Sequence, residues 1–212
     1  MISDYCKNSI FILDNFIMSE NLLKSYILNT IIMDEKQVDE FCSLFVARTV
    51  SRKEVILKYG EVSEFEAFVV KGLFKVYHTT PDALEQILYF AMEGWWLADI
   101  DSFNHQHPSQ LNIEALEDSE ILMISKADKE YAYEHIPGIE KLFRVMTQFS
   151  HVALQRRMIE NLSVQAYQRY LNFTEKYPRL AQRLTNVHIA AYLGISHEFV
   201  SRIRNRIVHK KS

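Results

Sequence analysis

The chain has 212 residues, enough for one large domain or two modest ones with a substantial core. Its composition, 48% hydrophobic and 24% charged, is that of a globular protein, and two cysteines are too few for a disulfide framework. The sequence has no run of 18 apolar residues, which would predict a transmembrane helix, and its N-terminus lacks the pattern of a signal peptide. We therefore expect a cytoplasmic protein with reduced thiols.

Charge is unevenly distributed along the chain. The whole sequence has a net charge of −3 at pH 7, whereas residues 179–212 hold seven Lys or Arg and one Glu, a net charge of +6. Residues 1–178 therefore carry −9, from 17 basic and 26 acidic side chains. A local basic segment on an acidic protein favours contact with phosphate groups.

The first two thirds of the chain change from helical to strand periodicity. Residues 1–17 have weak periodicity, which leaves open whether the extension at 1–20 is ordered or lies upstream of the natural start. Residues 18–45 follow a helical pattern, and from about residue 46 to 125 the period changes to two. Short strands separated by turns, such as Thr79-Thr80-Pro81-Asp82, predict an antiparallel barrel or jelly roll.

A second helical region follows Pro137-Gly138. Apolar residues recur three or four positions apart through about residue 162, which predicts a helix of about 25 residues and ~37 Å. Its apolar stripe is too broad to be covered by one small barrel. We interpret residues 138–162 as a dimerisation helix, with a long intramolecular helix as the alternative.

Residues 185–207, TNVHIAAYLGISHEFVSRIRNRI, have the sequence form of a helix-turn-helix. Thr185 and Ser196 are predicted N-caps, and Gly194 stands where the first helix needs a left-handed residue. Val187, Ile189, Ala190 and Leu193 give the first helix an apolar side, and Val200, Ile203 and Ile207 turn inward on the second. The outer face then suits a DNA groove, although a hairpin with a solvated basic face is the alternative.

Short motifs throughout the chain resemble one family. They are Val69–Gly72, Lys75–Tyr77, Gly94–Asp99, and Tyr192–Ser196 followed by Glu198 and Val200–Ile203. Together with the order of elements, over about residues 20–207, they resemble the cyclic-AMP receptor protein/FNR family of bacterial transcription regulators. The resemblance implies an α+β fold: an N-terminal helix and an antiparallel β-barrel of the cyclic-nucleotide-binding type in 21–137, the dimerisation helix 138–162, and a helix-turn-helix domain in 163–212.

The resemblance places Glu198, Ser201 and Arg202 at base-contacting positions. Arg202 can pair with guanine O6 and N7, and Glu198 can accept from cytosine N4, although favouring the helix N-terminus explains Glu198 equally well. Phosphate contacts are expected from Thr185, Asn186, Ser196, His197, Arg204, Lys210 and Lys211. Because the sequence ends five residues after Ile207, we expect no β-hairpin wing, and weaker non-specific affinity than in a winged relative.

The effector pocket departs from the family pattern. Cyclic-nucleotide-binding members grip the ribose with a glycine and a glutamate, and the phosphate with an arginine followed by a serine or threonine. Here Ala98 and Asp99 replace the first pair, Ser109 and Gln110 the second, and Leu154-Gln155 a Thr-Ser pair on the long helix. No arginine lies between Lys75 and Arg144, and a buried phosphate without a partner is costly. We therefore expect a degenerate pocket that binds no cyclic nucleotide.

Other cofactors are also not expected. Trp96, with Trp95, fills the pocket or lines an apolar site, and filling is the interpretation we favour. An iron–sulfur cluster needs grouped cysteines, and no haem site is expected. His105 and His107 could chelate a metal, but we find no cysteine or other third ligand beside them and expect a solvated loop. Asp99 and Asp101 are interpreted as helix caps, and no nucleophile–base set points to an enzyme.

These observations predict a homodimeric, sequence-specific transcription regulator. Its expected partners are double-stranded DNA with a palindromic operator and a second copy of the chain, with RNA polymerase as a further candidate and no membrane. The alternative is a ligand sensor that acts through protein partners and binds no DNA. A cupin-like enzyme would need a histidine and carboxylate cluster on the strands, and His78 alone does not supply one. The operator, the target genes and the effector do not follow from the sequence.

Overall fold

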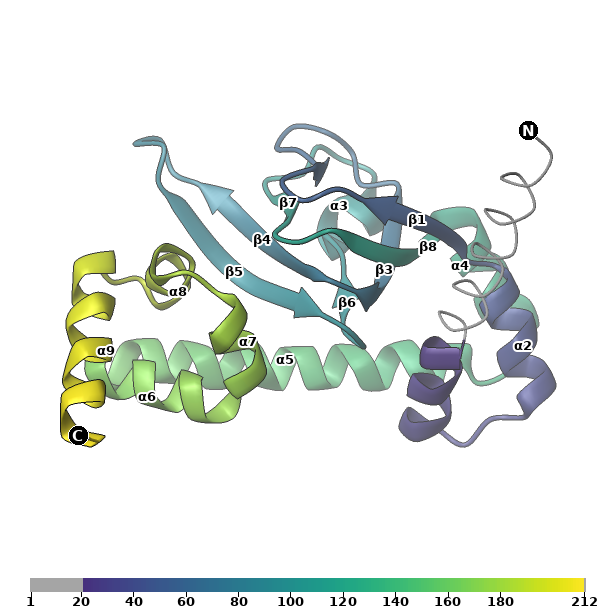
Figure 1. The fold of residues 1–212 in the computed structure, drawn as a ribbon. Coiled ribbons are helices and arrows are strands. Elements are labelled where there is room, and N and C mark those ends of the chain that lie inside the picture. The colour runs from purple at the N-terminus through teal and green to yellow at the C-terminus, as the bar shows by residue number, and fades with distance from the viewer. Residues whose placement is uncertain (1–20, 212) are drawn as a thin grey trace, which may run out of the picture. The chain divides into compact units, whose positions relative to one another are not determined.

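We describe a computed structural model of the chain (Figure 1). The structure describes residues 21–211, with side chains as far as Ile207. The extension at 1–20, whose order the sequence left open, lies outside these residues. The chain divides into two compact units. One contains residues up to 76 together with 90–146, and the other contains residues 77–89 together with those from 147 onward.

The strands of the described residues form two four-stranded sheets. The first has the order β1-β8-β3-β6 and the second β2-β7-β4-β5. The strand bounds are β1 Val46–Val50, β2 Val55–Leu57, β3 Phe65–Lys71, β4 Leu73–Thr79, β5 Glu85–Met92, β6 Trp96–Leu97, β7 Asn112–Ala115 and β8 Ser119–Ser125. In the first sheet, β8 pairs antiparallel with both β1 and β3. The predicted α+β fold with an antiparallel jelly roll is confirmed.

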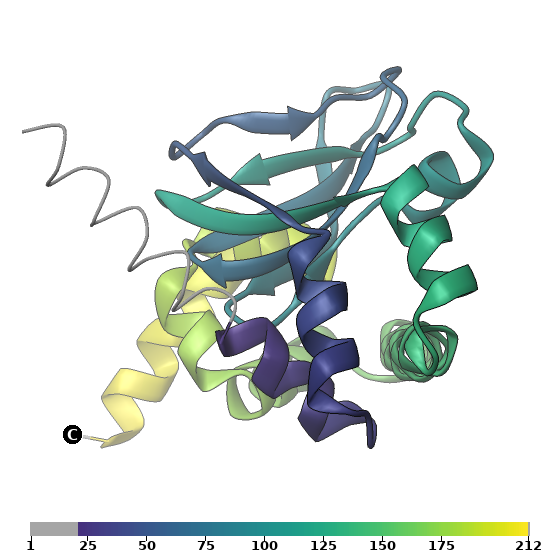
Figure 2. The same ribbon diagram turned by 90° about the vertical axis from the view of Figure 1, so that its right-hand side faces the viewer.

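A layer of helices covers one face of the first sheet (Figure 2). Residues 21–30 are helical and precede α2 (Glu35–Ser43), and α4 (Lys126–His135) leads into α5 (Ile139–Ser163). Phe68 and Leu122 point from β3 and β8 into the core that these helices share. The helices contribute apolar side chains exposed by 5% or less: Leu23, Ile27, Ile31, Val38, Phe41, Cys42, Ala132, Ile136, Ile139 and Leu142.

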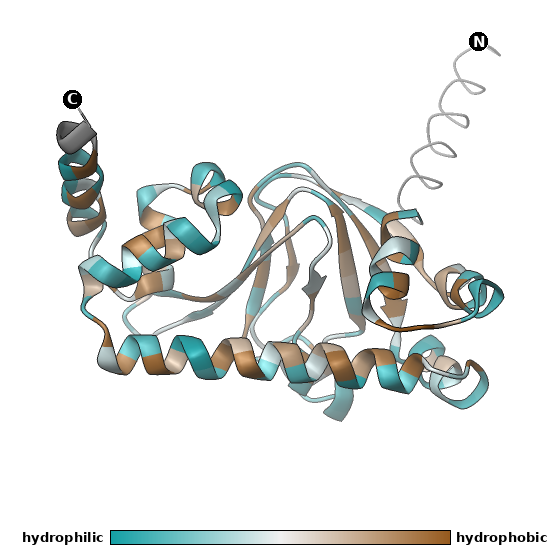
Figure 3. Cartoon of the chain, turned by 90° about the horizontal axis from the view of Figure 1, so that it is seen from below, coloured by the Kyte–Doolittle hydropathy of each residue, from teal (hydrophilic) through white to brown (hydrophobic). Residues whose placement is uncertain are grey.

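The long helix α5 changes character along its 25 residues. Its first turn is buried at Ile139, Leu142 and Phe143. Farther along, large apolar side chains are exposed, among them Phe149 at 70% and Ile159 at 61%. Figure 3 shows hydrophobic positions alternating with polar ones along the whole helix. Neither α5 nor any other helix among the described residues is long and apolar enough to cross a membrane.

Among the glycines of the first unit, Gly72 has the least room for a side chain. It joins β3 to β4 with a φ of +104°, and a Cβ built on it would lie 2.0 Å from Ser119 Oγ and 2.8 Å from Ser119 Cα. Its N–H donates to Glu93 Oε1 at 2.9 Å. Only glycine satisfies both the positive φ and the contact with the Ser119 backbone.

We predict that Gly72→Ala lowers the free energy of unfolding by about 3 kcal/mol or more, because left-handed strain and overpacking add. Gly94→Ala is the matched control, since Gly94 also has a positive φ (+81°) but its added Cβ would meet nothing within 4 Å. This control should lose only about 1–2 kcal/mol. Urea denaturation measures both, and equal losses would contradict the role assigned to the Ser119 contact.

Candidate DNA-binding surface and effector region

Four helices build the C-terminal region: α6 (Ala166–Lys176), α7 (Pro178–Arg183), α8 (Asn186–Leu193) and α9 (His197–Lys211). Thr185 Oγ1 accepts the His188 N–H at 3.2 Å, and Ser196 Oγ accepts the Phe199 N–H at 3.2 Å. Between the two helices Gly194 adopts the left-handed conformation, with φ 64° and ψ 42°. The two predicted N-caps and the predicted left-handed glycine are therefore confirmed, and they fix where α8 ends and α9 begins.

The two helices pack through their apolar sides. On α9, Val200 and Ile203 are 0% and 2% exposed, and on α8 Ile189 and Leu193 are buried. Val187 was expected on the same apolar side of α8, but 59% of its surface is exposed. At 100° per residue, Val187 lies well round α8 from the buried residues, so it faces solvent.

Glu198, Ser201 and Arg202 share the outer face of α9, because they follow one another at helical spacing. Glu198 and Arg202 are exposed and Ser201 is half-buried. The Arg202 guanidinium lies over the Phe199 ring, 5.4 Å from its centroid, which supports it at the surface. The structure thus brings together the three residues that the sequence assigns to base readout.

The carboxylate of Glu198 sits at the positive end of α9. Its own backbone N–H and the Ser196 hydroxyl lower the pKa of Glu198, and the nearby charges of His197 and Arg202 lower it further. His197 Nε2 lies 3.0 Å from Glu198 Oε1. Glu198 is therefore an ionised acceptor at neutral pH. Glu198 lies in the first turn of α9, where a carboxylate is favoured, and its side chain is still 65% exposed.

The expected phosphate contacts fall into two groups. The hydroxyls of Thr185 and Ser196 both accept cap bonds, and His197 is exposed. The Thr185 hydroxyl still has a proton to donate, whereas that of Ser196 donates to Glu198. Arg204 instead turns inward: its Nε donates to Tyr170 Oη at 3.1 Å and its Nη2 to the Ala181 carbonyl at 3.4 Å. This placement gives Arg204 a structural role, joining α9 to α6 and α7.

Three expected phosphate contacts remain: Asn186, Lys210 and Lys211. Asn186 is half-buried, and its Oδ1 is buried without a hydrogen-bond partner among the described residues. The side chains of Lys210 and Lys211 lie outside the described residues.

Two arginines hold the end of α8, and sequence reasoning did not single them out. Arg157 Nη2 donates to the carbonyls of Tyr192 at 2.7 Å and Ile87 at 2.9 Å, while Nη1 donates to the Leu88 carbonyl. Arg169 Nη2 donates to the Leu193 carbonyl at 3.0 Å. Burial lowers the pKa of Arg157 from its ordinary value. These guanidinium groups satisfy carbonyls that the helix end leaves open.

Asp99 and Ser109, expected at opposite ends of the degenerate pocket, are joined. Ser109 Oγ donates to Asp99 Oδ2 at 2.6 Å, and the two residues are only 2% and 7% exposed. Asp99 Oδ1 also accepts the N–H groups of Asp101 and Ser102, at 3.2 and 3.3 Å, and so caps α3 (Ile100–His105). The expected capping role of Asp99 is confirmed. Ala98 is half-buried and Gln110 exposed at the two ends of this segment.

Trp96 does not pack where the sequence interpretation put it. It pairs with Phe68 across β6 and β3, and so shares the sheet face that is covered by helices. Its ring centroid lies 5.6 Å from that of Phe68, 5.5 Å from Phe143 and 6.0 Å from Phe45. Trp96 thus fills the core between sheet and helices. Leu154 and Gln155 are exposed on the part of α5 that belongs to the other unit.

The central part of the chain is similar to a known domain family. Residues 47–134 match the family model of the cyclic nucleotide-binding domain. No curated protein matches the chain in sequence.

Solved structures match this domain together with the helices that follow it. FixK2 from Bradyrhizobium japonicum superposes with a TM-score of 0.70 at 20% identity, covering 79% of this chain and 86% of its own. The c-di-GMP-responsive global regulator CLP of Xanthomonas campestris gives 0.67 at 16% identity, covering 84% and 93%. The Thermus thermophilus catabolite activator protein gives 0.51 at 20% identity, covering 84% and 85%. The predicted resemblance is confirmed for the fold.

Proposed function

We propose that the chain is a sequence-specific DNA-binding transcription regulator that acts as a homodimer. The observation that carries the proposal is the outer face of α9, where Glu198, Ser201 and Arg202 lie on a capped helix in a segment of net charge +6. The three solved structures of like fold include a global regulator and a catabolite activator protein, which supports regulation rather than catalysis.

Base readout follows from the chemistry of this face. A guanidinium can donate two parallel hydrogen bonds to guanine, and an ionised carboxylate can accept only from a base amino group such as that of cytosine. Each such contact discriminates by about 1–3 kcal/mol. A surface that only contacts other proteins has no need of a carboxylate and an arginine at this spacing within a basic segment. That contrast favours DNA over the alternative of a ligand sensor acting through protein partners.

Homodimerisation is proposed through α5. Phe149, Val152 and Ile159 are 70%, 40% and 61% exposed and lie on one side of the helix. A second copy of the same helix, related by a two-fold axis, would cover this stripe with its own apolar residues. The same axis would give two recognition helices for the two halves of a palindrome. Binding to a palindrome would thus require a second copy of the chain, and that copy would also cover the exposed stripe.

The effector domain is proposed not to bind cyclic nucleotides. The hydrogen bond between Ser109 and Asp99 joins two of the positions where family members hold the ribose and the phosphate. A buried aspartate there would repel a cyclic phosphate, and no guanidinium from this stretch of sequence offsets the repulsion. The domain would then have kept its fold while losing its usual ligand.

Selection of bound DNA from a random pool tests the main proposal. We expect a palindrome whose half-sites are one helical turn apart, about 10 base pairs. Arg202→Ala should lower the affinity for this sequence about tenfold to a hundredfold and relax one position of each half-site. Arg206→Ala is the matched control, because it removes the same charge one turn farther along α9 and should weaken all DNA evenly.

Two further outcomes are informative. If Glu198 reads cytosine, Glu198→Ala will lose the preference at one position, whereas a purely capping role will leave the selected sequence unchanged. Failure to enrich any sequence at both low and moderate salt would contradict the DNA-binding proposal and favour the protein-partner alternative.

The dimer has its own test. Ile159→Glu places a charge in the exposed stripe and should convert the dimer to a monomer, as measured by analytical ultracentrifugation. Ser150→Glu introduces the same charge on the opposite side of α5 and should leave the dimer intact. Equal association of the wild type and Ile159→Glu would contradict the assignment of this face.

Calorimetry tests the effector domain. We expect titration with cyclic AMP or cyclic GMP to give no binding, and a micromolar or tighter dissociation constant would contradict the proposal. Asp99→Asn is the matched variant, since it keeps the size and the capping oxygen while removing the buried charge. If repulsion is the cause, any residual affinity should be higher in this variant.

A further inference from the structure

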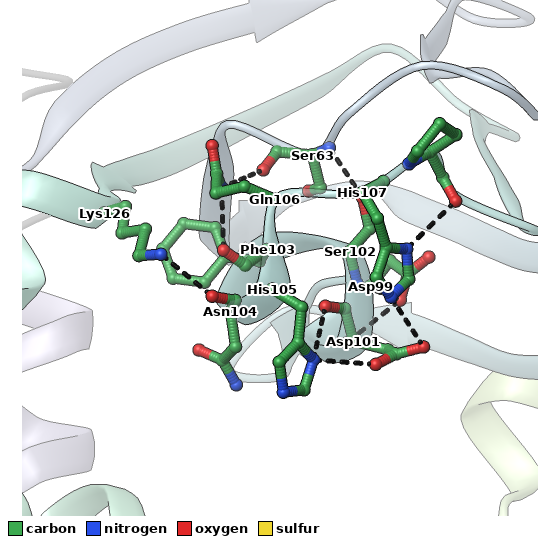
Figure 4. Close-up of polar contacts among 11 residues, drawn as sticks. Ser63, Asp99, Asp101, Ser102, Phe103, Asn104, His105, Gln106, His107 and Lys126 are labelled. Atoms are coloured by element: carbon green, nitrogen blue, oxygen red, sulfur yellow. Dashed lines mark hydrogen bonds and ion pairs between the residues drawn. The ribbon is translucent and has the colours of Figure 1, made fainter.

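The segment after Asp99 carries three side chains that sequence reasoning did not group. Asp101 and His105 lie four residues apart on α3, so they share one side of this helix. Asp101 Oδ1 lies 2.9 Å from His105 Nδ1, and Asp101 Oδ2 lies 3.3 Å from His107 Nε2 (Figure 4). The carboxylate therefore has one oxygen toward each imidazole.

The chain reverses after α3 in a way that brings His107 back to this side. Gln106 adopts the left-handed conformation, with φ 55° and ψ 40°, and its N–H donates to the Ser102 carbonyl. Ser102 Oγ donates to the His107 carbonyl at 2.6 Å, and the Gln106 side chain donates to the Phe103 carbonyl at 2.7 Å. Ser102 and Phe103 are buried. The reversal is thus anchored in the core and does not depend on a bound ligand.

The two imidazoles are arranged as a pair. Their planes are within 3° of parallel and their centroids are 6.0 Å apart. His107 Nδ1 lies 3.2 Å from the Pro108 carbonyl, to which it donates, and Nε2 faces Asp101. A metal ion that replaces the proton on Nε2 would leave the bond from Nδ1 in place. Such a bond from the other ring nitrogen to a carbonyl is the usual support of a histidine that binds a metal.

The spacing of the three groups fits one ion. One ligand atom from each residue lies within 4.8 Å of the others. Tetrahedral Zn²⁺ with bonds of about 2.0–2.1 Å holds its ligand atoms about 3.3 Å apart, so small side-chain rotations are sufficient. Two imidazoles and one carboxylate suit zinc, nickel, cobalt or iron(II), whereas Mg²⁺ and Ca²⁺ prefer oxygen ligands. Asp101 and His105 are exposed, which leaves the remaining positions for water or a further ligand.

We propose that Asp101, His105 and His107 form a binding site for one divalent transition-metal ion per chain. The site lies in the segment between Asp99 and Ser109, the positions from which related domains would hold their effector. The proposal concerns binding alone and does not depend on the DNA-binding function proposed above.

Calorimetric titration of the untagged protein with Zn²⁺ tests the site. We expect one ion per chain, and we expect Asp101→Asn, His105→Ala and His107→Ala each to weaken binding by more than about tenfold. Asp101→Asn keeps an acceptor oxygen and the size of the side chain, so its loss of affinity is not a folding effect. His135→Ala is the matched control, because His135 is an exposed histidine on α4 of the same unit.

A second readout identifies the ligands directly. Co²⁺ should develop visible absorption bands in the wild type and in His135→Ala, and these bands should be lost in His105→Ala and His107→Ala. Circular dichroism confirms that the variants are folded. No saturable Zn²⁺ binding by the wild type, or equal affinity in the three site variants and the wild type, would overturn the proposal.

Discussion

The arrangement of the second unit depends on the hydrogen bonds that the Arg157 guanidinium donates. A buried cation is costly unless its hydrogen bonds are satisfied, and here carbonyls of Ile87, Leu88 and Tyr192 accept them while the Tyr192 ring lies 4.1 Å beneath. One side chain from α5 thereby holds both the β4–β5 hairpin and the end of α8. Because α9 packs on α8 through Val200 and Ile203, the orientation of the candidate recognition helix within this unit follows from that contact.

Local signals were readable from the sequence, and long-range ones were not. Thr185, Gly194 and Ser196 act on residues within four positions of themselves, so their capping roles follow from spacing alone. Arg157 and Arg204 act on partners 20 or more residues away, at 69 and 34 positions in two of their bonds. The sequence pattern of a helix does not show whether an arginine on it contacts a phosphate or a buried carbonyl. The sequence therefore places the residues proposed to read bases on one face of α9, but it does not separate exposed arginines from those, such as Arg204, that bind buried carbonyls.

Trp96 shows a second limit of sequence reasoning. Its neighbours Gly94 and Leu97 match the family motif, which places it near the effector segment, yet the side of the strand it faces is set by the register with β3. Since one position of register reverses every side chain, proximity in sequence to Asp99 says little about which side Trp96 occupies. The signal for the three-residue cluster was present, in contrast: Asp101 stands one helical turn before His105, and helical spacing would have added it to the histidine pair.

The residues from Asp99 to Ser109 explain why we propose that this segment binds a metal ion but does not bind a cyclic nucleotide. Related domains hold an anion with a guanidinium, but this stretch has no arginine and places the Asp99 carboxylate in a hydrogen bond with Ser109. Asp101 adds a second carboxylate beside the imidazoles of His105 and His107. These groups would repel a phosphate and attract a cation, so the residues that we propose to weaken nucleotide binding are also ones that suit a metal. A change of ligand class would need no change of fold, because backbone hydrogen bonds and the Asp99 side-chain cap maintain α3 in the absence of any ligand.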